Sequence, residues 1–271
     1  MRVALKFDVL TRDAVRAGMP AVLQLLDTYR VQASFAVATG SQGSGWLAGF
    51  GTPIEREARD TLRAALAAGH EIGLAAHRPG VWTGRAARAG AAWTEQSFRQ
   101  GVEHLTAVLG RAPAFGAAPG WQVNPHLLIL EAQQHWSWCS DTRGRYPFLP
   151  LLQGVRGGCV QIPTTLPTVE EVVASGAAGP DKVHEYLYAE SRHVLPTGHV
   201  FSADVAQAGL QWLPTLEKLI VMWKGQDGAL RPLGRVYEEL ALDGLPLHQI
   251  GWGQLPGRSG HVAMQSLQVP K

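Results

Sequence analysis

Short apolar segments alternate with stretches of helical periodicity along almost the whole chain. Eight segments rich in β-branched and apolar residues are expected to be strands, at 2–9, 31–38, 70–76, 112–118, 135–140, 159–165, 198–205 and 228–232. Strands that alternate with helices are typical of repeated β-α units around parallel strands. The pattern therefore predicts an α/β fold, with the strands arranged as a barrel.

Start and stop signals place the helices between these strands. Apolar residues recur at steps of three and four between Thr94 and Gly110. Asn124-Pro125 supplies an N-cap followed by a proline in the first turn of the next helix. Further helices are expected after Pro20 and at 55–68, 181–193, 213–224 and 234–242. The glycine-rich segments 40–51, which contains Trp46, and 78–92 are expected to be loops at the barrel mouth.

Polar and aromatic groups fall at the predicted carboxyl ends of five strands. In barrel enzymes, chemistry lies at this face, whereas the opposite face mostly serves stability. The candidate catalytic residues are Asp8, Asp141, Arg143 and Asp204, and the candidate substrate-binding residues are His77, Trp82, Pro119, Gly120 and Trp121. Among the nine tryptophans, Trp121 is the best placed to stack on a sugar, although most tryptophans in a barrel are packing residues.

Asp141 and Arg143 are two residues apart, so strand alternation places them on one face. A guanidinium can bind a carboxylate or a phosphate through two hydrogen bonds. Arg143 is therefore expected to hold Asp8, a sugar carboxylate or a phosphate. The structural alternative is an ion pair with Asp141 that fixes the end of the strand.

Composition narrows the class of protein. The 271 residues are 46% hydrophobic and 17% charged, which predicts one globular domain spanning 1–271. The net charge is +2 and the basic residues are scattered, which does not favour nucleic-acid binding. Cys139 and Cys159 are expected to be buried thiols. Neither a G-x-S-x-G motif nor a phosphate-binding loop is present.

The location of the protein is also an expectation from sequence. The chain begins directly with a strand-like segment rather than a secretory leader, which predicts a cytoplasmic protein. No apolar run reaches the roughly 18 to 20 residues of a membrane span. Any membrane contact is therefore expected to be peripheral.

Several motifs carry a family resemblance. Phe7-Asp8, the segment 32–37 and Gly69-His70-Glu71-Ile72-Gly73 resemble the opening motifs of polysaccharide deacetylases with NodB homology. The segments 118–121, 140–148, 161–168 and 245–249 are more similar to the formamido-arabinose phospho-undecaprenol deformylases within that superfamily. The resemblance implies a distorted (β/α)7–8 barrel that cleaves the carbon–nitrogen bond of an N-acyl amino sugar or glycan-derived molecule.

The resemblance also implies a metal held by an aspartate and two histidines, with a second aspartate as base and a late histidine as acid. Here Asp8 keeps the position of the base, but Leu10 and, in an ungapped alignment after Gly73, Ala75 and Pro79 occupy the three ligand positions. A gap could instead bring His77-Arg78-Pro79 onto the closing His-Pro of the family motif, which restores one ligand at most. Asp204 stands where the acid histidine is expected. Catalytic zinc usually needs three protein ligands and one open position.

These replacements predict that family-type metal catalysis is lost and that no cofactor is bound. Two alternatives stay open. One is a non-catalytic protein that binds carbohydrate or a partner. The other is a hydrolase with zinc or another divalent ion at a rebuilt site formed by Asp8, His77 and Asp204.

Overall fold

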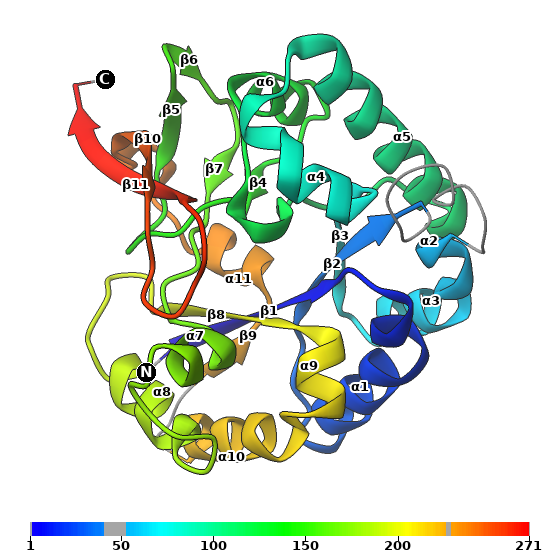
Figure 1. Cartoon of the computed structure of the whole chain (residues 1–271), viewed down its shortest axis with the longest axis vertical. Coiled ribbons are helices and arrows are strands. Elements are labelled where there is room, and N and C mark those ends of the chain that lie inside the picture. The colour runs from blue at the N-terminus through cyan, green and yellow to red at the C-terminus, as the bar shows by residue number, and fades with distance from the viewer. Residues whose placement is uncertain (1, 41–52, 226–228, 271) are drawn as a thin grey trace.

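The computed structural model describes residues 2–40, 53–225 and 229–270. Its central sheet is parallel, with the strand order β3-β2-β1-β8 (Figure 1). These strands are β1 (Arg2–Val9), β2 (Ser34–Thr39), β3 (Glu71–His77) and β8 (His199–Asp204). The short strand β9 (Ala229–Arg231) pairs in parallel with the first residues of β1.

The rest of the barrel is made of shorter pieces. Gly116 forms parallel bridges to Leu74 of β3 and to Cys139 of β4 (Trp138–Cys139). β4 pairs in parallel with β7 (Val160–Gln161). The backbone N–H of Thr165 then donates to the carbonyl of Val200 in β8 at 3.1 Å, which closes the ring. The distorted α/β barrel expected from the sequence is confirmed.

Helices lie around the outside of this ring (Figure 1). They are α1 (Met19–Thr28), α2 (Ile54–Glu57), α3 (Arg59–Ala67), α4 (Pro79–Arg85), α5 (Ala91–Leu109), α6 (Pro125–Gln133), α7 (Val169–Ala174), α8 (Val183–Ser191), α9 (Val205–Leu210), α10 (Leu213–Lys224) and α11 (Leu233–Glu238). A π-helical turn, η1 (Ala14–Gly18), leads into α1, and η4 (Pro119–Trp121) is a 3-10 turn. Within the described ranges, no helix is both long and apolar enough to cross a bilayer.

A second sheet stands at one side of the barrel and was not expected from the sequence. Its strand order is β11-β10-β5-β6, formed by β5 (Leu149–Leu152), β6 (Val155–Arg156), β10 (Leu247–Gly253) and β11 (Val262–Val269) (Figure 1). The backbone of Arg143 joins it to the barrel, since its N–H donates to Ala263 O at 2.8 Å and its carbonyl accepts from Gln265 N at 2.7 Å. The late segment of the chain is thereby attached at the barrel wall.

Three sequence expectations about individual segments need correction. The segment 78–92 is largely helical, because Arg78 takes a left-handed conformation (φ 53°) and Pro79 opens α4. The segment 112–118 contributes an isolated bridge at Gly116 rather than a full strand. α7 and α9 are short helices that the periodicity did not indicate. The predicted loop 40–51, apart from Gly40, lies outside the described residues, as does Trp46.

Two glycines allow η1 and α9 to approach closely. A Cβ placed on Gly18 would lie 2.3 Å from the carbonyl oxygen of Val205, and one placed on Gly209 would lie 2.3 Å from Gly18 O. Both obstacles are backbone atoms, which cannot rotate away. The contact therefore fixes the start of α9, directly after Asp204 at the barrel mouth.

We expect Gly18→Ala to lower the free energy of unfolding by about 1 to 3 kcal/mol, because the added methyl group overpacks this contact. Gly80→Ala is the matched control, since a Cβ at Gly80 meets nothing within 4 Å. Urea unfolding followed by circular dichroism measures both changes. Equal stability of the two variants would contradict the close packing of η1 on α9.

Candidate active site

Two charged side chains of β1 lie on the face that points into the barrel. Lys6 is 1% exposed, and its Nζ lies 3.7 Å from Asp8 Oδ1 and donates to Ser140 O at 3.4 Å. Asp8 Oδ1 is buried and has no hydrogen-bond partner within the described part of the chain. Burial raises the pKa of Asp8, while the positive charges of Lys6 and Arg258 oppose that rise. The ammonium group is the nearest counter-charge of this carboxylate.

Asp204 is the second carboxylate at the mouth. It is paired with Asp8 across β1 and β8, and its Oδ1 accepts from the backbone N–H groups of Ala206 and Gln207 at the start of α9. Burial raises the pKa of Asp204 to about 6, and the charge of Asp8 adds to the rise while the Gln207 N–H opposes it. A carboxyl group with this pKa can exchange a proton near neutral pH.

Trp121 lies beneath a group of cations rather than open to solvent. It is 4% exposed, and its ring centre is 4.7 Å from the guanidinium carbon of Arg143 and 4.5 Å from that of Arg258. Its Nε1 donates to Thr164 Oγ1 at 3.3 Å. A sugar could stack on this ring only after displacing a guanidinium. Pro119 and Gly120 precede it in the same turn, with Gly120 in the left-handed region (φ 64°).

The partner of Arg143 is Glu171, not Asp141. Nη1 of Arg143 lies 3.1 and 3.2 Å from the two oxygens of Glu171, and Nη2 donates to Leu166 O at 3.0 Å. Glu171 also forms a capping box with Thr168 at the start of α7 and lies 3.4 Å from Arg258. The structure thus gives Arg143 a buried ion pair with Glu171, in place of the expected Asp8 and of the alternative partner Asp141.

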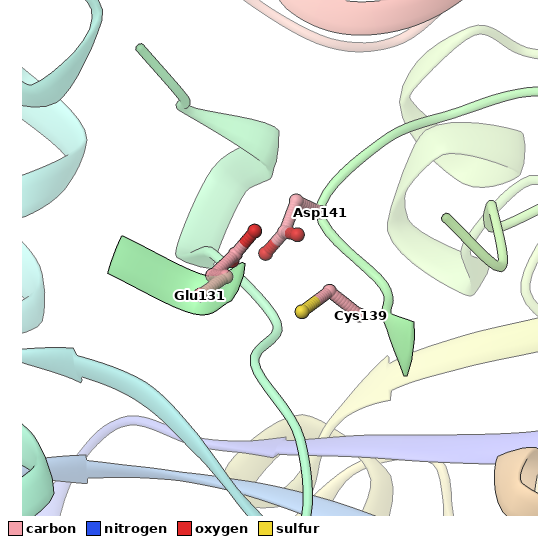
Figure 2. A group of neighbouring side chains, drawn as sticks. All are labelled: Glu131, Cys139 and Asp141. Carbon is pink, nitrogen blue, oxygen red and sulfur yellow. The ribbon is translucent and has the colours of Figure 1, made fainter. Parts of the chain in front are cut away.

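Asp141 belongs to a separate buried cluster with Glu131 and Cys139 (Figure 2). Its Oδ1 accepts from the backbone N–H of Ala118 at 2.7 Å, and its Oδ2 accepts from Gln161 Nε2 at 2.8 Å. Burial raises the pKa of Asp141 and, more strongly, that of Glu131. Asp141 is therefore held inside the barrel wall. The expectation that Cys139 and Cys159 are buried free thiols is confirmed.

His77 and Trp82 do not join the mouth carboxylates. The Nδ1 atom of His77 lies 3.1 Å from Thr39 Oγ1, and its ring packs edge-on against His104 of α5. Burial, with His104 adding, lowers the pKa of His77 to about 4. Trp82 is 1% exposed and donates from Nε1 to Gln122 O. Trp82 is packed in the interior, whereas the half-buried His77 borders a cavity of about 290 Å³ that residues of α4 and α5 also line.

The three positions aligned with metal ligands are apolar and packed. Leu10 packs against the hydrophobic core, Ala75 is buried in β3, and Pro79 is the buried first residue of α4. In the described ranges, the single group of three potential ligand side chains whose donor atoms lie within 4.8 Å of one another is Glu131, Cys139 and Asp141. Asp8, His77 and Asp204 do not form such a group.

Sequence reasoning missed four residues of the site. Lys6 could have been found, because alternation along β1 places it on the face of Asp8. Glu171 also left a signal, since Thr168-x-x-Glu171 is a capping box. Arg258 and Glu131 left no local signal, because only the tertiary fold brings the β10–β11 connection and α6 to the barrel.

We expect Glu171→Ala to lower the free energy of unfolding by about 3 to 5 kcal/mol, because it leaves the buried Arg143 without its counter-charge. Glu95→Ala is the control, since it breaks an exposed helix pair with Arg99 and should cost about 0.5 kcal/mol or less. Denaturant unfolding measures both. Similar losses in the two variants would show that the buried Arg143–Glu171 pair contributes no more to the free energy of unfolding than an exposed pair does.

Titration of Asp204 tests the coupling of the two mouth carboxylates. Its folded pKa lies above the ordinary value of 3.8, so its contribution to stability is complete below pH 3.8 and is lost as pH rises through about 6. Asp8→Asn removes a negative neighbour and should lower the midpoint of Asp204. Carboxyl ¹³C chemical shifts followed against pH measure it. A midpoint near 4 in both proteins would contradict the coupling.

The chain is similar to known proteins in both sequence and structure. No family model matches the chain. It is 26% identical over 304 residues, covering 100% of its own length and 96% of the other, to a Shewanella sediminis (strain HAW-EB3) protein assigned as the 4-deoxy-4-formamido-L-arabinose-phosphoundecaprenol deformylase ArnD.

Solved structures share the fold. A Mycobacterium smegmatis protein assigned as a polysaccharide deacetylase superposes with a TM-score of 0.70 at 19% identity, covering 94% of each chain. A mutant of a CE4 family pseudoenzyme with restored enzymatic activity superposes with a TM-score of 0.55 at 11% identity, covering 87% of this chain and 66% of the other. Over its full length, the chain is therefore a homologue of the ArnD deformylase, built on the fold of the polysaccharide deacetylases.

Proposed function

We propose that this protein binds an amino-sugar-derived molecule at the barrel mouth and has lost the metal-dependent amide hydrolysis implied by its family resemblance. The observation that carries the proposal is the ammonium group of Lys6, which lies 3.7 Å from Asp8 Oδ1. The likeness to a sugar deformylase over the full chain supports the substrate class.

The residues at the mouth do not fit a divalent metal ion. Leu10, Ala75 and Pro79 carry no donor atom on their side chains, and His77 is directed to Thr39 and His104. Two carboxylates remain, from Asp8 and Asp204. Catalytic zinc usually retains three protein ligands, so the donor set is short of what the ion needs.

Electrostatics also disfavours a cation beside Asp8. Two unit charges 4 Å apart interact by about 4 kcal/mol at an effective dielectric constant of 20. A divalent ion bound to Asp8 about 4 Å from the Lys6 ammonium is thus repelled by about 8 kcal/mol. This repulsion offsets much of the roughly 10 to 16 kcal/mol that a complete structural zinc site contributes. Lys6 therefore replaces a metal as the charge that compensates Asp8.

The mouth retains groups suited to a polar sugar. Side chains of Asp8, Asp204 and Arg258 are partly exposed, and the first two offer carboxylate oxygens to hydroxyl or amino groups. Arg258 offers N–H donors to hydroxyl or carbonyl oxygens. Because the ring of Trp121 is covered, binding through these polar groups is favoured over stacking.

A second function is favoured by the paired carboxylates. Asp8 and Asp204 are adjacent, and the pKa of Asp204 lies near 6. One carboxylate can accept a proton from water while the other donates one to a leaving amine. This arrangement supports slow amide hydrolysis without a metal as the alternative.

The test measures binding and turnover together on N-formyl and N-acetyl derivatives of glucosamine and 4-amino-4-deoxyarabinose. We expect binding by calorimetry, about tenfold weaker in Arg258→Ala because a donor to the sugar is lost, and unchanged in Arg99→Ala on the outer face of α5. We expect no release of formate or acetate on addition of zinc, cobalt or manganese.

The other outcomes distinguish a sugar-binding protein from a metal-dependent and from a metal-free hydrolase. Metal-dependent release that disappears in Asp8→Asn would overturn the proposal, as would the absence of binding to every sugar of the panel. Release that resists chelators and falls in Asp204→Asn would establish the metal-free hydrolase instead.

A further inference from the structure

The cluster of Glu131, Cys139 and Asp141 lies apart from the mouth residues and takes no part in the proposed function. The three side chains come from α6, β4 and the residue pair that follows β4, and each residue is at most 1% exposed. One donor atom from each lies within 4.8 Å of the others. Figure 2 shows the Glu131 carboxyl group and the Cys139 sulfur directed toward the Asp141 carboxyl group.

One atom of the cluster is left without a partner. Glu131 Oε2 is fully buried and has no hydrogen-bond partner within the described residues. A void of about 10 Å³, about the space of one water molecule, borders Glu131 and Asp141; most of its lining is apolar, and Cys139 is not part of it. A Cβ at Gly116 would lie 3.0 Å from Glu131 Oε1, so glycine keeps room around this carboxyl group.

Asp141 is held in a fixed orientation. Its oxygens accept from Ala118 N and from Gln161 Nε2, and each oxygen keeps a second lone pair. Hydrogen bonds of this kind orient the carboxylates that ligate metals.

Two carboxyl groups and a thiol buried together cannot all carry uncompensated charge. They need either shared protons or a bound cation. Sulfur and oxygen donors together suit zinc, with bonds of about 2.3 Å to sulfur and about 2.0 to 2.2 Å to oxygen. Tetrahedral geometry then separates the donor atoms by about 3.5 Å, so the present donors need to move closer by only about 1 Å.

We infer that Glu131, Cys139 and Asp141 form a closed site for one zinc-like divalent ion that ties α6 to β4. The site has no exposed position, and structural zinc is almost always four-coordinate, so a buried water would have to complete the coordination beside the three side chains. Asp141 also holds the N–H of Ala118, directly before the Pro119–Trp121 turn. An ion at this place therefore fixes the wall from which the mouth turn projects.

The test uses the full chain, reduced, stripped with a chelator and then titrated with cobalt or zinc. We expect one ion per chain by elemental analysis after gel filtration, a cobalt–thiolate charge-transfer absorption, and a higher melting temperature with zinc. Cys139→Ser should abolish the absorption, and it and Glu131→Gln should each weaken zinc binding about tenfold or more. Circular dichroism checks that the variants fold.

Two controls locate the ion. Cys159→Ser changes a neighbouring buried thiol whose Sγ donates to Trp136 O, and it should keep the absorption. The double variant Asp8→Asn/Asp204→Asn should also keep full binding.

Three results would contradict the metal site or its assignment, and each has a different consequence. A folded wild-type protein that binds no ion would overturn this inference and leave the proposed function intact, and the cluster would then be a proton-sharing pair. Loss of the absorption in Cys159→Ser would overturn the three-residue assignment. Binding lost in the double variant but kept in Cys139→Ser would overturn both the inference and the proposed function.

Discussion

The pairing of Lys6 with Asp8 inside the barrel is the interaction on which the rest of the mouth depends. Both residues stand on the inward face of a strand buried on both sides, where a single charge would be poorly solvated. The ammonium offsets the charge of the carboxylate, and Arg258 adds a second positive charge near Asp8. Leu10 packs against the hydrophobic core, and under the proposed function no cation is held beside it.

Arg143 is the centre of a second group of charged residues in the barrel wall. Arg143 connects three parts of the molecule: its backbone pairs with β11, its guanidinium binds Glu171 at the start of α7, and the same group covers Trp121. Because the pair with Glu171 is buried, it resists exchange with solvent or ligand. The ring of Trp121, which the sequence suggested as a platform for a sugar, is thereby part of the wall.

The features that depend on local sequence were predicted, whereas most of those that depend on contacts between distant segments were not. The central strands follow from apolar runs, since burial on both faces leaves a direct compositional trace at 2–9, 31–38 and 198–205. α4 was mistaken for a loop, because Pro79, Gly80 and Gly84 leave it little apolar periodicity. β10 and β11 were missed, because only a third of their residues are buried and the apolar pattern is correspondingly weak. Asp8 and Asp204 were correctly placed at the carboxyl ends of strands, and the structure shows that these two strands are neighbours. His77 was expected beside them, but the irregular pairing near Thr39 turns it toward α5. Such a bulge has no signature in a single sequence.

The central claim, that the mouth compensates Asp8 with an amino group instead of a metal, is tested most directly by anomalous X-ray diffraction. Crystals soaked in zinc or cobalt would be measured on both sides of the absorption edge of the ion. The account predicts no anomalous peak within bonding distance of Asp8 or Asp204, and an ordered Lys6 ammonium beside Asp8. A full-occupancy peak about 2.0 to 2.2 Å from an oxygen of Asp8, with Lys6 displaced, would contradict it.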